Sequence, residues 1–134
     1  GLTVYDLEEV ELCYAPQFGA AKDPVNIAAM IAANALRDDA PVRFWNEPLD
    51  DVLLDVRDPD EFEAGHVPGA INIPLHQLRE RLQELPQTQS VSVYCLVGQR
   101  AYYATRLLRL NGVDARNMTG GYKTFLQFQE TCAE

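Results

Sequence analysis

A buried-strand pattern, a short glycine-containing loop and a helical pattern follow one another in the second half of the chain. Val91–Tyr94 is almost continuously apolar, which predicts a buried strand. Residues 101–111 carry small or apolar side chains at helical spacing and end at Gly112, as is typical of a helix with a glycine after its last turn. The loop between them is Cys95-Leu96-Val97-Gly98-Gln99-Arg100. A strand that passes through so short a loop into a helix indicates an α/β fold.

Cys95 stands where an anion is stabilised without a metal or cofactor. The loop can turn successive N–H groups inward, and the unpaired N–H groups at a helix start add about half a positive charge. Gly98 allows the backbone to approach the sulfur closely, and Arg100 brings a permanent cation. A cysteine after a strand is more often a packing residue. With these neighbours, we interpret Cys95 as a nucleophile.

The alternation of strand and helix patterns extends from Pro41 to the end of the chain. We expect strands at 42–45, 52–56, 70–74, 91–94 and 114–118, and helices at 58–62, 75–85, 101–111 and from Gly120 to about Gln129. Such alternation indicates an α/β fold with a mainly parallel sheet covered by helices on both faces. Ligands of such folds bind beyond the carboxyl ends of the strands, where Cys95 is expected.

Four stretches match the rhodanese (sulfurtransferase) family in order and spacing. They are Leu53–Arg57, Phe62–Pro74, Cys95–Arg100 and Met118–Tyr122. Together they cover about residues 41–130, so this part of the chain resembles a rhodanese domain. The resemblance implies a rhodanese-like fold with a five-stranded sheet and transfer of a sulfane sulfur through a persulfide on Cys95.

The same resemblance assigns roles around the nucleophile. The outer sulfur is expected to bind in the loop formed by Leu96, Val97, Gly98, Gln99 and Arg100, held by backbone N–H groups. Asp55, Arg57 and His66 are expected to support the site, the first two by pairing with neighbouring loops. The related phosphatases and arsenate reductases use a loop one residue longer, sized for a tetrahedral oxyanion, so this loop length favours sulfur transfer.

Leu96 and Val97 bear on the sulfur donor. Thiosulfate-specific members of the family carry basic residues in this loop, and burying a sulfonate against apolar side chains is costly. We therefore expect a small-molecule persulfide or thiol as partner, from coenzyme A, glutathione or polysulfide, and weak use of thiosulfate. A non-catalytic rhodanese-like binding or regulatory module is the alternative. The presence of Cys95, Gly98 and Arg100 together favours the enzyme.

Residues 1–40 have a different pattern from the rest of the chain. Asp23 and Pro24 form a helix start, and apolar residues at helical spacing predict a helix from Val25 to about Leu36. Asp38–Pro41 then interrupts the pattern. We expect one domain boundary here, which divides the chain into residues 1–40 and 41–134.

The segment Glu11–Ala28 resembles the end of the dimerisation domain of flavin-dependent pyridine nucleotide–disulfide oxidoreductases. The nearest branch contains coenzyme A-disulfide reductase and NADH-dependent persulfide reductase, some members of which carry a C-terminal rhodanese domain. Residues 1–40 are then the remnant of a dimerisation domain with its linker, and Tyr14 matches a tyrosine near the coenzyme A site. The resemblance implies partner flavin domains in the same parent chain and leaves open a homodimer. Without a dinucleotide fingerprint here, we expect no cofactor in this piece, and FAD and NAD(P)H only in the missing domains.

Charge and cysteine content exclude several classes of partner. The formal net charge of −9 disfavours nucleic acid and anionic membranes. No apolar run reaches the roughly 18 residues of a membrane span. The three cysteines lack the spacing of a disulfide framework or a zinc site, so we expect no metal and a cytoplasmic location. Cys13 and Cys132 are interpreted as bystanders, with Cys132 left open as an acceptor thiol.

Overall fold

The protein was analysed as a computed structural model, which describes residues 1–10, 23–86 and 88–132. The chain divides into two compact units, Gly1–Asp39 and Ala40–Glu134. The expected turn near Pro16, together with Cys13 and Tyr14, lies outside the described residues.

In its described residues, 1–10 and 23–39, the first unit contains the helices α1 (Val4–Glu9) and α2 (Pro24–Leu36). The expected helix at 25–36 is confirmed as α2, with the Asp23 carboxylate accepting a hydrogen bond from the Val25 N–H at 2.9 Å. The sequence analysis assigned no helix to α1, whose six residues are too few to show a clear helical period. The buried Asn26 side chain links the two helices by donating to the Val10 carbonyl at 2.9 Å.

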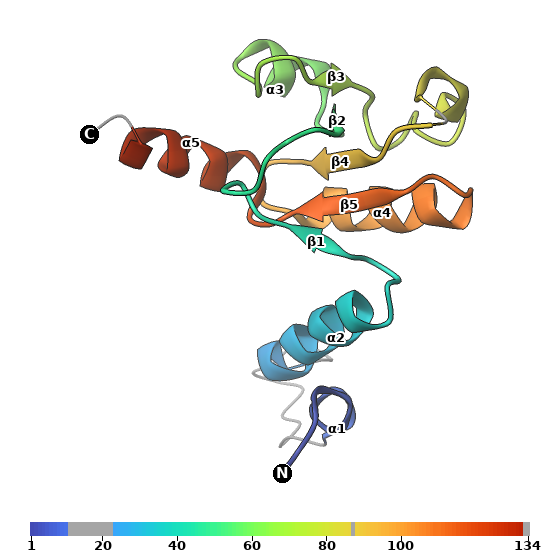
Figure 1. Ribbon diagram of the computed structural model, residues 1–134, viewed down its shortest axis with the longest axis vertical. Helices are drawn as coiled ribbons and strands as arrows, with labels where there is room; N and C mark the ends of the chain where they lie inside the picture. Colours follow the sequence, from blue (N-terminus) through green and yellow to red (C-terminus); the bar gives the residue numbers. More distant parts are fainter. Residues whose placement is uncertain (11–22, 87, 133–134) are drawn as a thin grey trace, which may run out of the picture. The chain divides into compact units, whose positions relative to one another are not determined.

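The second unit is built on a five-stranded sheet in which all neighbouring strands are parallel. The strands are β1 (Val42–Arg43), β2 (Val52–Asp55), β3 (Ile71–Asn72), β4 (Val91–Tyr94) and β5 (Ala115–Met118). Their order is β1-β5-β4-β2-β3, so β4 lies at the centre, and Figure 1 shows β5 between β1 and β4. The predicted α/β fold with a parallel five-stranded sheet is confirmed, although β1 and β3 are shorter than expected.

Three α-helices connect or follow these strands. They are α3 (Pro59–Glu63), α4 (Gln99–Leu110) and α5 (Gly121–Cys132). Each is close to its predicted position. The α3 helix starts where the Asp58 N–H donates to the Glu61 carboxylate at 3.1 Å.

The helix expected at 75–85 is wrong. Residues 75–80 form turns, and only a 3₁₀-helix, η1 (Leu82–Glu84), follows. The leucine spacing misled because Leu78 and Leu85 both reach the core from turn backbone rather than from one continuous helix face. Their N–H groups donate to the carbonyls of Leu75 and Leu82, three residues back, as in turns and 3₁₀ structure.

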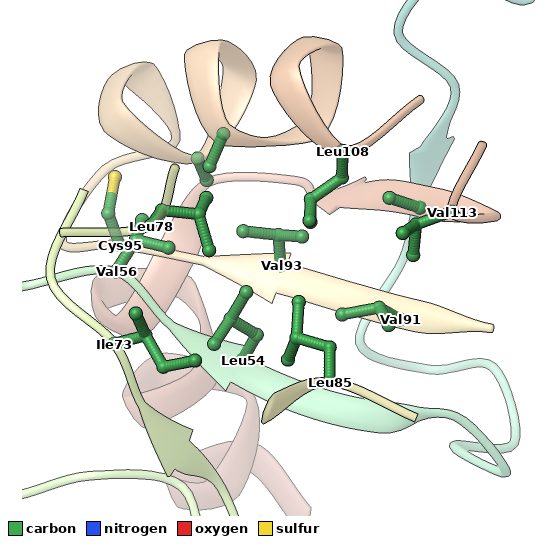
Figure 2. Packing of buried hydrophobic residues seen from close by; sticks show 13 residues of the cluster. Leu54, Val56, Ile73, Leu78, Leu85, Val91, Val93, Cys95, Leu108 and Val113 are labelled. Atoms are coloured by element: carbon green, nitrogen blue, oxygen red, sulfur yellow. The ribbon is translucent and has the colours of Figure 1, made fainter. Parts of the chain in front are cut away.

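Two apolar clusters, one on each face of the sheet, hold this unit together. On one face, Val91, Val93 and Cys95 pack with Leu54 and with side chains of α4 such as Leu108 (Figure 2). On the other face, buried aromatic and apolar side chains gather beneath α5, namely Trp45, Val67, Tyr94, Met118 and Phe125. Because side chains alternate along a strand, β4 supplies both clusters, and helices cover both faces as expected.

The strand directions determine where a site can form. Because all five strands are parallel, their carboxyl ends meet at one edge of the sheet, and Cys95 directly follows β4 at this edge. In Figure 1, α5 begins at the edge toward which the arrows of β4 and β5 point. In the described part of the chain, no helix combines the length and apolar character needed to cross a membrane.

Candidate active site

Cys95 is buried at the edge of the sheet and faces α4. Its exposed fraction is 1%, and Figure 2 shows its sulfur directed toward the first turn of that helix. The N–H of Gly98 donates to Sγ at 3.2 Å. Gly98 has φ of 104° and is the N-cap of α4, so a left-handed backbone turns the loop into the helix and aims this N–H at the sulfur.

The carbonyl groups of Cys95 and Leu96 point toward α5. The Cys95 carbonyl accepts from the Tyr122 N–H at 2.8 Å, and the Leu96 carbonyl accepts from the Lys123 N–H at 3.1 Å. In a trans peptide the C=O and the following N–H point in opposite directions. The N–H groups of Leu96 and Val97 therefore point away from α5, toward the face of the sheet on which Sγ lies. The structure thus places the Gly98 N–H at the thiol and turns the N–H groups of Leu96 and Val97 away from α5.

Burial controls how Cys95 can react. A donor sulfur must come within about 3–3.5 Å of Sγ in a reactive geometry, so it has to enter the loop. The most exposed side chains of the loop are uncharged, namely Val97, which is 53% exposed, and Gln99, whereas the charged Arg100 is partly buried and paired with Glu61. A donor therefore meets apolar and amide groups before it meets the thiol.

Arg100 contributes to the loop through an ion pair that the sequence analysis did not anticipate. Its guanidinium binds both carboxylate oxygens of Glu61, at 2.6 and 2.8 Å, and lies 3.5 Å from the Asp58 carboxylate. Hydrogen bonding to Glu61 raises the pKa of Arg100, and the same bond from Arg100 lowers the pKa of Glu61. The cation thus clamps α4 to α3 instead of standing free beside the sulfur.

Asp55 and Arg57 form a buried pair behind the loop. The Arg57 Nε and Nη2 donate to the Asp55 carboxylate at 2.7 to 3.0 Å, and Nη2 also donates to the Gly65 carbonyl at 2.7 Å. Burial opposes the charge, but the hydrogen bonds and charge of Asp55 outweigh it and raise the pKa of Arg57. The pair joins the end of β2 to the segment after α3, so its observed contacts are architectural.

Two tyrosines complete the packing around Arg57. Its guanidinium carbon lies 4.4 Å from the ring centroid of Tyr122 and 5.8 Å from that of Tyr94. The Tyr94 hydroxyl accepts a hydrogen bond from the Val67 N–H at 3.2 Å, and burial raises the pKa of Tyr94. These contacts tie β4, the segment around Gly65 and α5 into one support for the loop.

His66 is placed apart from the loop. Its ring stacks on Phe62 with centroids 3.8 Å apart, and Nδ1 lies 2.9 Å from the Phe62 carbonyl. The residue is exposed, and within the described residues it makes no hydrogen bond to residues 95–100. Its observed role is to pack on α3.

A second buried polar cluster lies at the other end of β4. The Asp51 carboxylate accepts from Ser92 at 2.6 Å and also binds Ser90 and the buried Arg43. Burial opposes ionisation of Asp51, but the two serine hydroxyls and Arg43 lower its pKa to about 2. Sequence analysis missed this cluster.

Within the described residues, no group of three or more His, Cys, Asp or Glu side chains is arranged to hold a metal ion. Cys13 lies outside the described residues, as does the side chain of Cys132. The expected absence of a metal and the roles of these two cysteines stay predictions.

The family profile of the rhodanese-like domain matches residues 36–127, which is more than half of the chain. The chain belongs to the rhodanese-like domain family. The Bacillus subtilis (strain 168) protein YqhL is 46% identical to it over 72 residues, which are 53% of this chain and 57% of YqhL. Human thiosulfate:glutathione sulfurtransferase is 34% identical over 90 residues, which are 56% of this chain and 78% of that enzyme.

Two solved structures resemble this rhodanese-family chain over nearly all of its length. Reduced Bacillus anthracis CoADR-RHD has a TM-score of 0.82 and 40% identity, and the match covers 91% of this chain and 23% of that one. The NAD-dependent persulfide reductase from A. fulgidus has a TM-score of 0.75 and 34% identity, covering 90% of this chain and 22% of that one. The chain therefore spans less than a quarter of either protein. The resemblance to the rhodanese domain of this reductase branch is confirmed.

The functional contacts that sequence analysis missed in this rhodanese domain join residues far apart in the chain. Glu61, in the first turn of α3, pairs with Arg100, which lies 39 residues later, and the sequence analysis assigned Glu61 no role. Tyr122 lies in the Gly-Gly-Tyr stretch that supported the resemblance, but no periodicity indicated that its N–H holds the Cys95 carbonyl. A sequence signal existed for Tyr122 alone.

Proposed function

We propose that this rhodanese domain is a sulfurtransferase that carries sulfane sulfur as a persulfide on Cys95. The observation that carries the proposal is the hydrogen bond from the Gly98 N–H to Sγ, in a loop whose Cys95 and Leu96 carbonyls are held by α5. Such donors stabilise negative charge on sulfur at the loop centre. The human relative named as a thiosulfate:glutathione sulfurtransferase supports the same reaction class.

The reaction has two balanced steps. The Cys95 thiolate attacks the outer sulfur of a persulfide R–S–SH, whose S–S bond breaks. The leaving thiolate R–S⁻ takes the proton from the transferred sulfur, so the products are Cys95–S–S⁻ and R–SH. An acceptor thiol R′–SH then takes the outer sulfur, giving R′–S–SH and the Cys95 thiolate again. No external oxidant or reductant is consumed, and the N–H groups of the loop bind the outer sulfur between the steps.

The charges around the loop favour an organic persulfide over thiosulfate. Leu96 and Val97 bring no charge, and the guanidinium of Arg100 is already bound by the Glu61 carboxylate at 2.6 and 2.8 Å. Placing the dianionic thiosulfate there means desolvating its sulfonate without a free cation among the loop residues 95–100. Persulfides of coenzyme A or glutathione, or a polysulfide, bring a smaller charge to the buried sulfur.

We also propose that the chain is the C-terminal part of an FAD- and NAD(P)H-dependent disulfide or persulfide reductase in the cytoplasm. The two reductase matches cover 91% and 90% of this chain. Ala40–Glu134 alone is shorter than that, so both matches extend into Gly1–Asp39. This shared segment, which lies outside the family match at 36–127 for most of its length, supports a common chain organisation.

Mass spectrometry tests the persulfide. The protein is incubated with coenzyme A persulfide, and we expect one added sulfur atom on the peptide that contains Cys95 and none in Cys95→Ala.

A second experiment tests the parent enzyme. The full-length chain is expected to show flavin absorbance and to oxidise NAD(P)H when a persulfide is added. A chain without bound flavin would contradict the second proposal and leave the first intact.

A non-catalytic binding module is the second candidate, and the burial of Cys95 favours it. A thiol that is 1% exposed reacts slowly if the loop does not admit a donor. Alkylation by iodoacetamide at pH 6 discriminates between the two. A reactive Cys95 is modified at that pH in the folded protein, whereas the thiol of a binding module is modified only after unfolding.

A further inference from the structure

We propose that the start of α5 positions the reactive loop, and that Gly121 is the residue that makes this possible. This inference rests on the proposed sulfurtransferase function. The α5 helix follows β5, and its first N–H groups have no partner within the helix. Two of them are used by the loop, since the Tyr122 N–H donates to the Cys95 carbonyl at 2.8 Å and the Lys123 N–H to the Leu96 carbonyl at 3.1 Å.

These two hydrogen bonds set the direction of the loop N–H groups. The Cys95 carbonyl and the Leu96 N–H belong to one planar peptide, as do the Leu96 carbonyl and the Val97 N–H. Because both carbonyls are held by α5, both N–H groups are turned toward the opposite face of the sheet. Sγ lies on that face, beneath α4 (Figure 2). The α5 helix therefore orients donors for the sulfur without touching the sulfur itself.

A third contact holds the far end of the loop. The Asn117 side-chain amide, on β5, donates to the Gly98 carbonyl at 3.3 Å, and that carbonyl also accepts from the Tyr102 N–H at 2.9 Å. The peptide group between Gly98 and Gln99 is thereby held by β5 and by α4. Strand β5 and the helix after it thus hold three carbonyl groups of the loop.

Gly121 is required by the closeness of this contact. A Cβ at this position would lie 2.4 Å from the Cys95 carbonyl oxygen and 2.8 Å from the Leu96 carbonyl carbon and the Val97 nitrogen. All three are backbone atoms of the loop, which cannot rotate aside as a flexible side chain would. A side chain here therefore displaces the loop or α5. Gly121 also has φ of +63°, which adds strain for any other residue.

The chain offers a matched control for the strain. Gly112, after the last turn of α4, has φ of +80° and no atom within 4 Å of its Cβ position. Replacing it by alanine imposes a similar backbone cost without a steric clash. The comparison of Gly121→Ala with Gly112→Ala thus isolates the contact with the loop from the loss of a left-handed glycine.

We expect both variants to lose stability toward urea, and only Gly121→Ala to lose function. The rate of sulfur transfer from coenzyme A persulfide should fall at least about tenfold in Gly121→Ala, because two N–H donors move away from the outer sulfur. The loss should appear in kcat rather than in KM, and the persulfide on Cys95 should decay faster. Transfer within twofold of Gly112→Ala would overturn the proposal.

A second variant covers a failure of Gly121→Ala to fold. Asn117→Ala removes the donor to the Gly98 carbonyl and leaves Gly121 in place. We expect kcat to fall by about threefold to tenfold, which is less than in Gly121→Ala, while the KM for coenzyme A persulfide stays unchanged. A kcat equal to that of the wild type would contradict the positioning role of β5 and α5.

Failure of the function and failure of this inference give different results. If the wild-type protein accepts no sulfur on Cys95, the proposed function is wrong. The positioning role is then tested by the pH dependence of Cys95 alkylation, which reports the stabilisation of negative charge at Sγ. The pH of half-maximal alkylation rate should rise in Gly121→Ala and stay at the wild-type position in Gly112→Ala; equal profiles would refute the positioning role.

Discussion

The two ends of the central strand β4 show two uses of buried polar groups. At the amino end, Ser92 and Arg43 surround the Asp51 carboxylate, so the charge is satisfied within the protein. At the carboxyl end, the N–H of Gly98 donates to Sγ of Cys95 at 3.2 Å, the single hydrogen bond to this sulfur among the described residues. The polar groups at the amino end bind one another and contribute to stability. At the carboxyl end, the N–H groups of the loop are proposed to bind the transferred sulfur. Substitutions at the two ends should separate stability from chemistry.

The largest expected effect is on activity at the carboxyl end. Cys95→Ala removes the sulfur on which the proposed persulfide forms, so sulfur transfer should fall at least about 10³-fold. Its unfolding free energy should fall by only about 1 kcal/mol, since one buried sulfur is lost from the core. Ser92→Ala, the matched change at the amino end, should keep transfer within twofold and cost about 1–2 kcal/mol. Urea unfolding and persulfide transfer assays measure both. Equal losses of activity in the two variants would contradict the assignment of sulfur transfer to the carboxyl end and of stability to the amino end.

Breaking the amino-end cluster should have the largest effect on stability. Asp51→Asn leaves the guanidinium of Arg43, whose side chain is 9% exposed, without its carboxylate, and should cost about 3 kcal/mol of unfolding free energy at pH 7. The pKa of Asp51 is lowered to about 2, so its ionised form stabilises the fold above the ordinary carboxyl pKa. That stabilisation is lost as the pH falls from about 4 toward 2.

The pH dependence gives this prediction an internal check. The difference in unfolding free energy between the wild type and Asp51→Asn should shrink by about 1–2 kcal/mol between pH 5 and pH 2, after allowance for screening by solvent. Urea titrations across that range measure the difference. If this difference in unfolding free energy stays constant down to pH 2, the stabilisation by Asp51 does not depend on its negative charge.

What could be predicted from the sequence differs between the same two ends. The carboxyl end was accessible because Val91–Tyr94, the loop after it and α4 are contiguous, and each part carries a local signal. The amino-end cluster joins Asp51 to Ser92, 41 residues away, and no periodicity links such residues. The same reason hid the pairing of Glu61 with Arg100.

The spacing of apolar residues also gave a wrong prediction where turns, rather than a helix, bring side chains into the core. Leu78 and Leu85 are both buried, and their spacing favoured a helix that the structure replaces by turns and η1. Binary patterning records which residues are buried, but turns can also bring leucines to the core. The five-stranded parallel sheet, by contrast, depended on several alternating segments at once and was predicted correctly, whereas the order of its strands was not predicted.

An intermediate effect, on the choice of sulfur donor, is expected for the ion pair between Glu61 and Arg100. Glu61→Gln keeps the side-chain size but removes the charge that neutralises Arg100, at 2.6 and 2.8 Å. The released guanidinium should improve the use of thiosulfate, by about threefold to tenfold in kcat/KM, while the use of coenzyme A persulfide stays within about twofold. Because Glu61 is partly exposed, the stability cost should be about 1 kcal/mol or less. Steady-state kinetics with both donors measure the ratio.

Asp60→Asn is the control for the Glu61 prediction. It also removes one acidic charge from α3, but it lies on an exposed position of the same helix. We expect both donors to be used as in the wild type. An equal gain in thiosulfate activity for Asp60→Asn and Glu61→Gln would show that total charge, rather than the pairing with Arg100, selects the donor.

The smallest effect on activity is expected for His66, which the resemblance named as a supporting residue and which packs on α3 apart from the loop. Its ring stacks on Phe62 at 3.8 Å and remains exposed, so it has no route to the buried Sγ in this arrangement. His66→Gln should change kcat/KM by less than about twofold and leave the shape of the pH profile between pH 5.5 and 8 unaltered. A profile that changes shape in His66→Gln would assign a proton-transfer step to His66 and show that a catalytic group lies outside the loop. The outcome therefore decides whether the reactive end of β4 works through backbone donors alone.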